Sequence, residues 1–423
     1  MTKERLISLD VFRGLTILLM TIVNNPGSWE AIYHPLMHSE WHGCTPTDLV
    51  FPFFIFIMGA AVSFAMPTKL YNKTTFNKIL TRSIRIFCLG LFLYFFGQIE
   101  IFKLQGIPLL LGRLAITALV GYLLMGNFSS KIKTYFAFGV LGSLLFLAYS
   151  GIEAYQNVRI PGVLQRIGII YFVVSLLNLK TNQKTQALVA TILLLVYWAV
   201  MTLVPVPGIG DTNLHKGTNL AAWIDSILLK GHMWNGTKTW DPEGILSTIP
   251  AIASGIIGLL IGQLINSTMS QVRIVKRMII IGVPLIALAL VWDIIFPINK
   301  SIWTSSYVLY TSGLATIFLA ALYYIIDIAK YTKWTQLFVI FGVNSMIVFF
   351  LSGIIPKALK MIEFQNPKAT SEKINLLDFL YYFGIDPYFN NPKTASLAFA
   401  LLYVLFWTVL LWLFYKNKLI FKV

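Results

Sequence analysis

The sequence has 423 residues, of which 57% are hydrophobic and only 12% are charged, with a formal net charge of +16. Soluble domains carry about 25% charged residues, so this composition excludes an ordinary soluble protein. Runs of roughly 20 apolar residues, each long enough to cross ~30 Å of hydrocarbon as a helix, recur along the whole chain. Outer-membrane strands are excluded because they alternate over about ten residues. We therefore expect an all-α, polytopic transmembrane helical bundle with about 11–12 spans.

The predicted spans follow the hydrophobic segments in chain order. The first contains Asp10 and Arg13, and no small-residue cleavage site follows it, so we interpret it as an uncleaved span rather than a signal peptide. The whole chain, residues 1–423, is expected to form a single transmembrane domain. The predicted segments cover residues 6–23, 49–66, 83–99, 107–125, 134–150, 163–179, 187–204, 246–266, 278–296, 307–328, 336–355 and 395–415.

Basic residues are distributed unequally between the two sides that these spans define. One side collects 20 of the 33 lysines and arginines but only three of the 17 acidic residues. By the positive-inside rule this side is cytoplasmic and holds both termini. The net charge therefore reflects membrane topology, and no stacking platform for nucleic acid accompanies it. The basic residues of this side are Lys3, Arg5 and Arg13, with the clusters at 69–85, 131–133, 180–184, 273–277, 330–333 and 416–422.

The long loops, at about 24–48, 205–245 and 356–394, all fall on the opposite, extracytoplasmic side. The first two contain every histidine of the chain and several tryptophans. Titratable and stacking groups are thus concentrated on one face, which is where we expect a functional site. These residues are His34, His38, His42, His215 and His232, with Trp41, Trp223, Trp234 and Trp240.

The segment from His34 to Asp48 holds the densest chemistry in the chain. A histidine with a near-neutral pKa can act as a general base or nucleophile, and a carboxylate such as Asp48 can fix its tautomer. The alternative is a solvated loop whose histidines have no role. On a helix, His34, His38 and His42 would share one face and could bind a metal. Ligands spread over two turns reach poorly around one ion, which argues against that reading.

Charges inside or beside the predicted spans form a second group of candidates. Asp10 and Arg13 are three residues apart and can pair on one helix face, as a structural pair or as functional intramembrane charges. Arg82 and Arg85 begin the predicted third span from inside. They are expected to be orientation anchors, and the alternative is that they dock a phosphorylated cytosolic cofactor. The tryptophans of the second outer loop suit an interfacial belt or stacking on sugar faces.

Several motifs resemble the family of heparan-α-glucosaminide N-acetyltransferases and its bacterial relatives. The resemblance extends from residue 8 to about residue 350, and its strength lies in the common order of motifs that are individually weak. The matching runs are SLDVFRGLT at 8–16, VN at 23–24, HSEWHGCTPTDLVFP at 38–52, RIPGVLQRIG at 159–168, DPEG at 241–244, PINKSIWTSSY at 297–307 and GVNS at 342–345.

The resemblance implies an acetyl-CoA-dependent amino-sugar N-acetyltransferase that works across a membrane. Acetyl-CoA would come from the cytosol, and the acceptor would be the free amine of a glucosamine residue on the far side. The catalytic role falls to His38, with Asn24 as a second active-site residue and Asp48 as the acid ten residues after the histidine. His38 would act as a general base, or would carry the acetyl group in a ping-pong route. No metal is implied, and a homodimer is a family-level expectation.

We also expect cations to bind the CoA phosphates, and acidic and aromatic groups to bind the acceptor sugar. The cofactor candidates are Arg13, Arg82, Arg85, Arg166 and Lys300, and the acceptor candidates are Asp241, Glu243, Trp240 and Trp41. The run DPEG at 241–244 is also typical of a turn that precedes a helix.

Two other functions compete with the acetyltransferase. Many spans with polar residues also suit an amino-sugar or N-acetyl-sugar permease, because membrane architecture does not determine function. The inverted repeats of many transporters are not evident here. A non-catalytic glycan receptor is the third possibility. The sequence has no counterpart of the N-terminal luminal portion of the lysosomal enzyme, so we expect an integral protein of a bacterial inner membrane.

Overall fold

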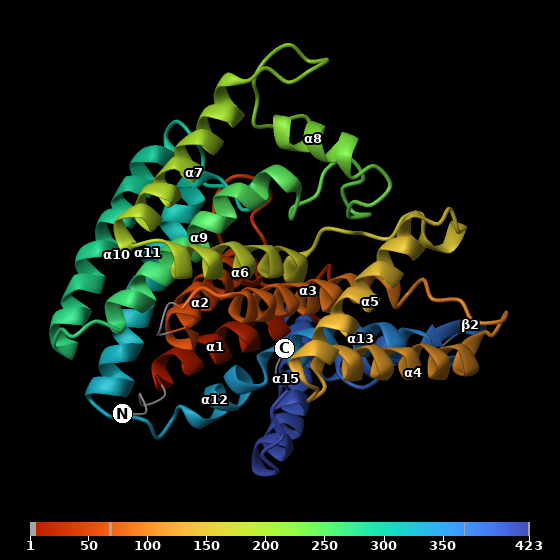
Figure 1. The fold of residues 1–423 in the computed structure, drawn as a ribbon. Helices are drawn as coiled ribbons and strands as arrows, with labels where there is room; N and C mark the ends of the chain where they lie inside the picture. The colour runs from red at the N-terminus through yellow and green to blue at the C-terminus, as the bar shows by residue number, and fades with distance from the viewer. Residues whose placement is uncertain (1–5, 67–69, 368, 422–423) are drawn as a thin grey trace.

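The structure is a computed structural model that describes residues 6–66, 70–367 and 369–421 (Figure 1). Its described residues form a helical bundle with one small hairpin, which confirms the expected all-α architecture. The helices are α1 (Ile7–Val23), α2 (Val50–Ala65), α3 (Lys73–Phe95), α4 (Gly106–Met125), α5 (Ser130–Tyr149), α6 (Val163–Lys180), α7 (Gln183–Leu203), α8 (Leu220–Leu228), α9 (Ile245–Ile265), α10 (Gln271–Asp293), α11 (Ser305–Leu322), α12 (Gln336–Val343), α13 (Ser345–Lys360), α14 (Leu376–Tyr382) and α15 (Pro392–Lys416), and the strands are β1 (Glu363–Asn366) and β2 (Ala369–Asn375).

Each of the twelve expected segments coincides with a helix or a pair of helices. Nine helices in the described part of the chain are long and apolar enough to cross a membrane. The count rises to ten if α12 and α13, bent by 77° at Asn344, form one broken span. The two expected spans outside that count are α1, which has 17 residues, and α3, which is interrupted by several basic side chains.

Helix α3 begins ten residues before the predicted start of its span. The side chain of Asn72 caps it by accepting a hydrogen bond from the backbone N–H of Thr75 at 2.8 Å. Such a cap satisfies a backbone donor that the first turn leaves free. Arg82 and Arg85 therefore lie in the interior of a 23-residue helix rather than at its beginning. Hydropathy located the apolar part of the helix and missed its polar first turns, and the prediction that these arginines start the membrane span stays a prediction.

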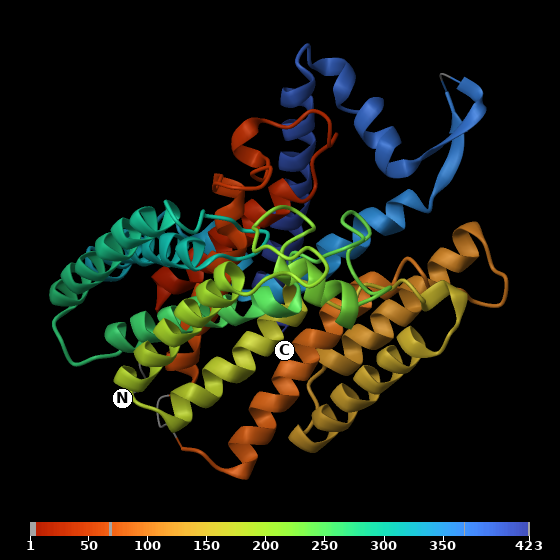
Figure 2. The same ribbon diagram turned by 90° about the horizontal axis from the view of Figure 1, so that it is seen from above.

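Figures 1 and 2 show α10 and α11 on one side of the bundle, α4 and α5 on the other, and α1, α2, α6 and α9 between them. Close approach of α2 and α9 depends on glycine. A Cβ on Gly59 would lie 2.0 Å from the carbonyl oxygen of Gly255, and one on Gly258 would lie 2.1 Å from that of Phe56. Small residues let helix backbones touch in a bilayer, where van der Waals packing drives association. This contact places the outer end of α2, next to Asp48, against the centre of the bundle.

The third predicted outer loop has regular structure of its own. Helix α13 continues through Pro356 to Lys360, beyond the expected end of its span. Strands β1 and β2 then pair antiparallel, with Glu363 opposite Asn375. Figure 2 shows this hairpin and α14 at the edge of the molecule, apart from α4 and α5. The segment is thus a small structured projection rather than part of the bundle core.

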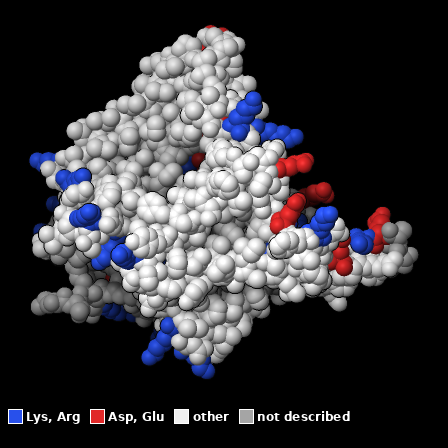
Figure 3. All heavy atoms as spheres, turned by 45° about the vertical axis from the view of Figure 1, so that its right-hand side comes forward, with Lys and Arg blue, Asp and Glu red and all other residues white. Residues whose placement is uncertain are grey.

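Surface charge follows the asymmetry found in the sequence. On the face in Figure 3, Lys and Arg alone colour the left and lower edges, whereas Asp and Glu appear at the top and right. Four basic residues of the charge count, Lys3, Arg5, Lys69 and Lys422, lie outside the described residues. The assignment of the basic side to the cytosol stays a prediction.

Candidate active site

The histidine segment is an irregular loop and not the continuous helix that a shared metal-binding face would need. A short 3-10 turn, η1 (His34–Leu36), is followed by extended backbone, and Gly43 has φ +101°, a left-handed conformation that favours glycine. His42 is directed toward another partner, with Nδ1 3.4 Å from Nδ2 of Asn299. Among the described residues, no group of three His, Cys, Asp or Glu side chains is arranged to hold a metal ion.

His38 and Asp48 form the pair that the sequence predicted. Nδ1 of His38 lies 2.7 Å from Oδ1 of Asp48. Asp48 belongs to the short turn η2 (Pro46–Leu49), which leads directly into α2. An ionised carboxylate can only accept, so Nδ1 carries the hydrogen and Nε2 keeps its lone pair. The Asp48 side chain is fully buried, whereas that of His38 is 53% exposed. The buried carboxylate therefore orients the imidazole ring, while about half of the His38 side chain stays accessible.

Asp48 is held by its own loop. Oδ2 accepts hydrogen bonds at 3.0 Å from the backbone N–H of Ser39, from the backbone N–H of Thr45 and from the Thr45 hydroxyl. Tyr307 on α11 donates its hydroxyl to the backbone carbonyl of Asp48 at 2.6 Å. The three bonds to Oδ2 stabilise the ionised carboxylate in a buried place, and the Tyr307 bond fixes the backbone of Asp48. They also join residues from two distant parts of the chain.

Lys300 lies beside this pair, on the connection between α10 and α11. Its Nζ is 3.4 Å from Oδ1 of Asp48, 2.9 Å from Nδ1 of His38 and 3.3 Å from Nε2 of His38. Burial lowers the pKa of the Lys300 ammonium, although the negative charges of Asp48 and Glu243 oppose the shift. The site thus contains a base, its orienting acid and a cation within hydrogen-bonding reach.

A cavity of about 540 Å³ opens in front of His38. It brings together residues from five separate motifs, and apolar side chains of α1, α2 and α13 also line it. Predicted site residues that line it are His38, Asn24, Asp48, Glu243, Trp240 and Lys300. Other lining residues are Met20, Val23, Ser39, Glu40, Thr47, Val50, Phe51, Phe54, Arg159, Val163, Lys216, Trp234, Gly236, Thr237, Pro242, Ser301, Trp303 and Phe349.

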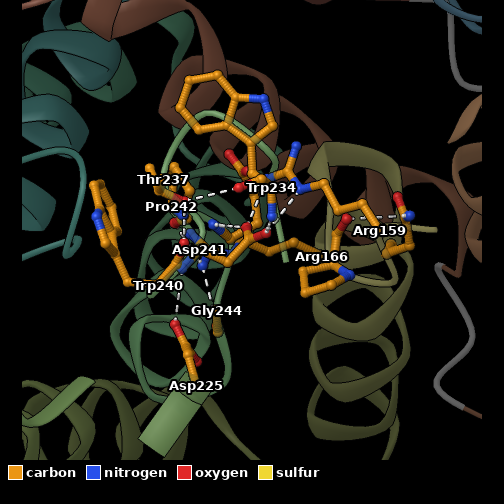
Figure 4. Close-up of polar contacts among 12 residues, drawn as sticks. Arg159, Arg166, Asp225, Trp234, Thr237, Trp240, Asp241, Pro242 and Gly244 are labelled. Carbon is orange, nitrogen blue, oxygen red and sulfur yellow. Dashed lines mark hydrogen bonds and ion pairs between the residues drawn. The ribbon is translucent and has the colours of Figure 1, made fainter. Parts of the chain in front are cut away.

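Arg159 lines the cavity and holds together the residues of the DPEG turn (Figure 4). Its guanidinium bonds to Asp241 twice, through Nε to Oδ2 at 2.8 Å and through Nη2 to Oδ1 at 2.6 Å. It also pairs with Glu243 and donates to the Tyr94 hydroxyl at 2.7 Å. The sequence reasoning gave Arg159 no role. It lies in the RIPG motif at 159–162, which was the available signal, but a lone basic residue in an outer loop carries little information.

Asp241 does not face the cavity, contrary to its expected contact with the acceptor. Each of its carboxylate oxygens already accepts two hydrogen bonds, and its side chain is fully buried. Besides Arg159, the donors are the backbone N–H groups of Trp234 and Glu243, each at 2.9 Å. The same carboxylate therefore shapes the DPEG turn and holds Arg159 in place. Glu243 is the acid of this motif that lines the cavity.

Arg166 and Trp41 lie behind the cavity wall. Arg166 is 1% exposed, and it donates to the backbone carbonyls of Pro242 and Gly244 at 3.0 and 3.2 Å. Its guanidinium packs over the ring of Trp303 at 5.1 Å. Trp41 donates its indole N–H to the Leu214 carbonyl and packs edge-on against Trp240. Both support residues of the wall instead of lining it, so direct contact with cofactor or acceptor is not what their positions favour.

The remaining arginine candidates lie away from this cavity. Arg13 pairs with Asp10 at 3.0 Å, as the helix spacing predicted. Arg82 packs over the Tyr171 ring at 4.9 Å, and the buried Arg85 donates to the Leu124 carbonyl. None of the three is among the residues that line the described cavity. Their role toward CoA stays a prediction.

The pKa values of the acidic residues near Arg159 depend on burial, which raises them, and on nearby cations and hydrogen bonds, which lower them. Burial alone would raise the pKa of the Glu243 carboxyl, but Arg159 and Arg166 outweigh it and lower that pKa. Asp225 on α8 is different. Burial raises its pKa to about 6, against hydrogen bonds from the backbone N–H groups of Ile245 and Asp241. Glu243 is thus held as a carboxylate, while Asp225 titrates close to neutral pH.

Comparison with known proteins relates the chain to a family and to named enzymes. Residues 5–204 match the family described as Domain of unknown function (DUF5009). The Homo sapiens protein named Heparan-alpha-glucosaminide N-acetyltransferase is 27% identical over 399 residues, covering 82% of this chain and 52% of the human protein. The Mus musculus protein of that name is 26% identical over 480 residues, covering 100% of this chain and 61% of the mouse protein. This chain is similar along its length to heparan-α-glucosaminide N-acetyltransferases.

The resemblance found in the sequence motifs is thereby confirmed. The chain spans between half and two thirds of the length of these curated N-acetyltransferases. The DUF5009 match includes His38, Asp48 and Arg159, but it ends before Glu243 and Lys300. The mouse N-acetyltransferase aligns with the whole chain, so the similarity extends over both halves of the cavity.

Proposed function

We propose that this protein is a transmembrane N-acetyltransferase that moves an acetyl group from acetyl-CoA to the amine of a glucosamine-type sugar. The observation that carries the proposal is the His38–Asp48 pair, which is anchored by a buried carboxylate and exposed to a cavity of about 540 Å³. The relationship to named N-acetyltransferases supports the reaction class. The acceptor would bind on the extracytoplasmic side, and acetyl-CoA would arrive from the cytosol.

His38 acts as the general base in this mechanism. Nε2 accepts a proton from the acceptor amine as the amine nitrogen attacks the thioester carbonyl carbon. The new C–N bond forms, the C–S bond breaks, and the sulfur of CoA leaves with the electron pair. Asp48, 2.7 Å from Nδ1, fixes the tautomer and stabilises the imidazolium. A ping-pong route through acetyl-His38 is the competing mechanism. Labelled acetyl trapped on the protein without acceptor would favour that route.

Asn24 supplies a hydrogen bond to the oxyanion that develops at the carbonyl. It follows the last residue of α1 and lines the same cavity as His38. One donor in such a role stabilises the transition state by about 3 kcal/mol. Its position at a helix end keeps the amide group at the cavity edge while its backbone N–H stays bonded to α1.

The wall formed by Glu243 and Trp240 is the acceptor subsite. Glu243 offers a carboxylate to an amino sugar, and Trp240 offers a ring face that suits a sugar ring. Asp241 contributes indirectly, because it holds the Arg159 that pairs with Glu243. Trp41 likewise acts through its contact with Trp240, at a ring separation of 5.3 Å.

The proposed binding of acetyl-CoA is argued from the distribution of charge and not from the residues that line the cavity. Arg13, Arg82 and Arg85 are the candidate ligands for CoA phosphates on the face that the positive-inside rule assigns to the cytosol. Arg166 is buried behind the wall, where its Nη2 donates to Pro242, Gly244 and Ser247, and Lys300 contacts His38, so we assign phosphate binding to neither residue. A bacterial inner membrane and a homodimer remain part of the proposal as expectations.

Purified protein reconstituted in liposomes tests the function directly. With acetyl-CoA and glucosamine, we expect release of free CoA thiol and formation of N-acetylglucosamine. The matched control is His34→Ala, because His34 is exposed in the same loop and does not line the cavity. Uptake of unmodified sugar without any thiol release would reject the enzyme in favour of the permease.

A further inference from the structure

Lys300 is positioned by the fold and is not a flexible surface lysine. Its connection is tied to the histidine loop, because Gly43 donates its backbone N–H to the Ile298 carbonyl at 2.7 Å. The neighbouring Asn299 is fully buried, and its backbone N–H and side-chain oxygen are bonded to Thr304 and Ile302. The Lys300 side chain is only 19% exposed. The loop that carries the cation is therefore locked to the loop that carries the base.

The hydrogen-bond inventory of His38 decides where the ammonium can donate. Nδ1 points its hydrogen at Asp48, so it offers no lone pair to Lys300. Nζ of Lys300 lies beside the ring, 2.9 Å from Nδ1 and 3.3 Å from Nε2 of His38. Because Nδ1 bears the hydrogen, the acceptors left to the ammonium are Nε2 and, at 3.4 Å, Oδ1 of Asp48. The cation therefore contacts the nitrogen that must take a proton during acyl transfer. This contact gives Lys300 a role at the base itself, in addition to any role in binding the phosphates of CoA.

The charged surroundings of Lys300 come from several elements. The carboxylates that face it are Asp48 from η2 and Glu243 from the DPEG turn, and the Cys44 thiol, whose pKa burial raises to about 12, is a neutral neighbour. A buried ammonium needs such partners, because desolvation favours its neutral form. Burial lowers the pKa of the Lys300 ammonium and makes it a stronger acid than an exposed lysine, while the two carboxylates oppose that shift.

We propose that Lys300 is the acid partner of His38 in the acetyl transfer, passing its proton to the leaving sulfur and recovering one from the histidine. This inference rests on the function proposed above. As the amine attacks, Nε2 of His38 takes one amine proton, and the C–S bond breaks with its electron pair on sulfur. The Lys300 ammonium protonates that thiolate to the CoA thiol. Neutral Lys300 then accepts the proton from the His38 imidazolium across their contact, which restores both groups.

Two substitutions at Lys300 separate proton transfer from simple positive charge. Lys300→Arg keeps the cation, but guanidinium does not release its proton in proteins. Lys300→Met keeps most of the length and removes the charge. We expect both to lower kcat by about 100-fold, the range for loss of one acid–base group, with KM for acetyl-CoA changed less than about threefold. The control is Lys230→Met, an exposed outer-loop lysine that does not line the cavity.

The pattern of kinetic constants decides between roles. Near-normal kcat in Lys300→Arg would overturn the relay and leave a purely electrostatic role. A raised KM with unchanged kcat would overturn it in favour of donor binding. The pH–rate profile adds a readout that a structural role would not move, since the alkaline limb should disappear in both variants. An inactive wild-type protein would reject the proposed function itself, and the relay with it.

A measurement without turnover tests the contact separately. Diethyl pyrocarbonate acylates accessible neutral imidazole nitrogens, and mass spectrometry can follow the peptide that contains His38. We expect Lys300→Met to raise the labelling rate of His38 several-fold, while exposed His34 labels equally in both proteins. An unchanged His38 rate would show that Lys300 does not cover Nε2, and the inference would fail whatever the activity of the wild type.

Discussion

Two charged clusters meet at the same cavity, and they differ in how far the side chain that pairs with the buried carboxylate is exposed. In the cluster around Asp241, the carboxylate is fully buried and each oxygen accepts two hydrogen bonds. In the cluster around Asp48, the carboxylate is equally buried, but its partner His38 is 53% exposed and lines the cavity, with Lys300 beside it. A buried ion pair serves mainly to hold structure, whereas a pair with an exposed imidazole can also reach a substrate. The comparison assigns the two clusters different roles.

The largest expected effect comes from removing the His38 imidazole. His38→Ala should reduce acetyl transfer by at least about 1000-fold, because the base and its contact with Asp48 are both lost. Protein yield and apparent Tm in detergent should change little, since the lost side chain is half exposed. Thiol release from acetyl-CoA measures the first quantity and a thermal-shift assay the second. A variant with near wild-type turnover would remove His38 from the mechanism.

Breaking the cluster around Asp241 should lower the stability of the folded protein. Arg159→Met leaves Asp241 and Glu243 buried without their cation, and loss of one partner of such a pair costs about 3–5 kcal/mol. We expect a clear fall in apparent Tm by thermal shift. Lys373→Met is the matched control, because its pair with Glu363 is 4.0 Å long and exposed, and exposed pairs contribute about 0–1 kcal/mol. Equal shifts for the two variants would contradict the contrast between the clusters.

The fold could be predicted where hydropathy alone determines it. The twelve apolar segments all became helices, since buried backbone in a bilayer has few alternatives. Their ends were harder, because polar first turns such as Asn72–Thr75 depend on side-chain capping and not on apolar length. The projection formed by β1, β2 and α14 was read as a plain loop, and its pairing of Glu363 with Asn375 leaves no hydropathy signal.

The site was predictable only within single motifs. His38 and Asp48 are ten residues apart, so sequence could link them as base and orienting acid. Lys300 contacts His38 across 262 residues, and Arg159 contacts Asp241 across 82. Contacts at that separation are set by how α2, α6, α9 and α11 pack. The motif order named the right segments, while the roles of Arg159 and Asp241 required the packed structure.

Asn24 offers a smaller test on the His38 side of the comparison. Asn24→Ala should lower kcat by about 100-fold, equivalent to the ~3 kcal/mol of one oxyanion donor, without a change in apparent Tm. Asn25→Ala is the neighbouring control, because Asn25 donates to the Thr21 carbonyl at 2.9 Å and does not line the cavity. Steady-state thiol release gives both values. If the two variants lose activity equally, Asn24 has a structural role at the end of α1 and does not stabilise the oxyanion.

The smallest expected effect is a pH dependence in the cluster around Asp241. The pKa of Asp225 is raised from 3.8 to about 6, chiefly by burial. Between those values the folded protein holds a proton that the unfolded chain releases, so this carboxyl stabilises the fold at low pH. That contribution is lost as pH rises through about 6. An aspartate elsewhere in the chain with a lowered pKa would show the opposite sign.

Asp225→Asn isolates this contribution, because all other titrating groups are shared with the wild type. Asparagine has one acceptor oxygen for the two backbone N–H groups that Asp225 now satisfies, at 3.0 and 3.2 Å, so it carries a constant cost at every pH. The wild-type advantage in apparent Tm should therefore be larger at pH 5 than at pH 7.5, by an amount equivalent to about 1–2 kcal/mol. An advantage that stays constant or grows with pH would mean that Asp225 is ionised throughout, and that the cluster holds a full extra negative charge beside Glu243.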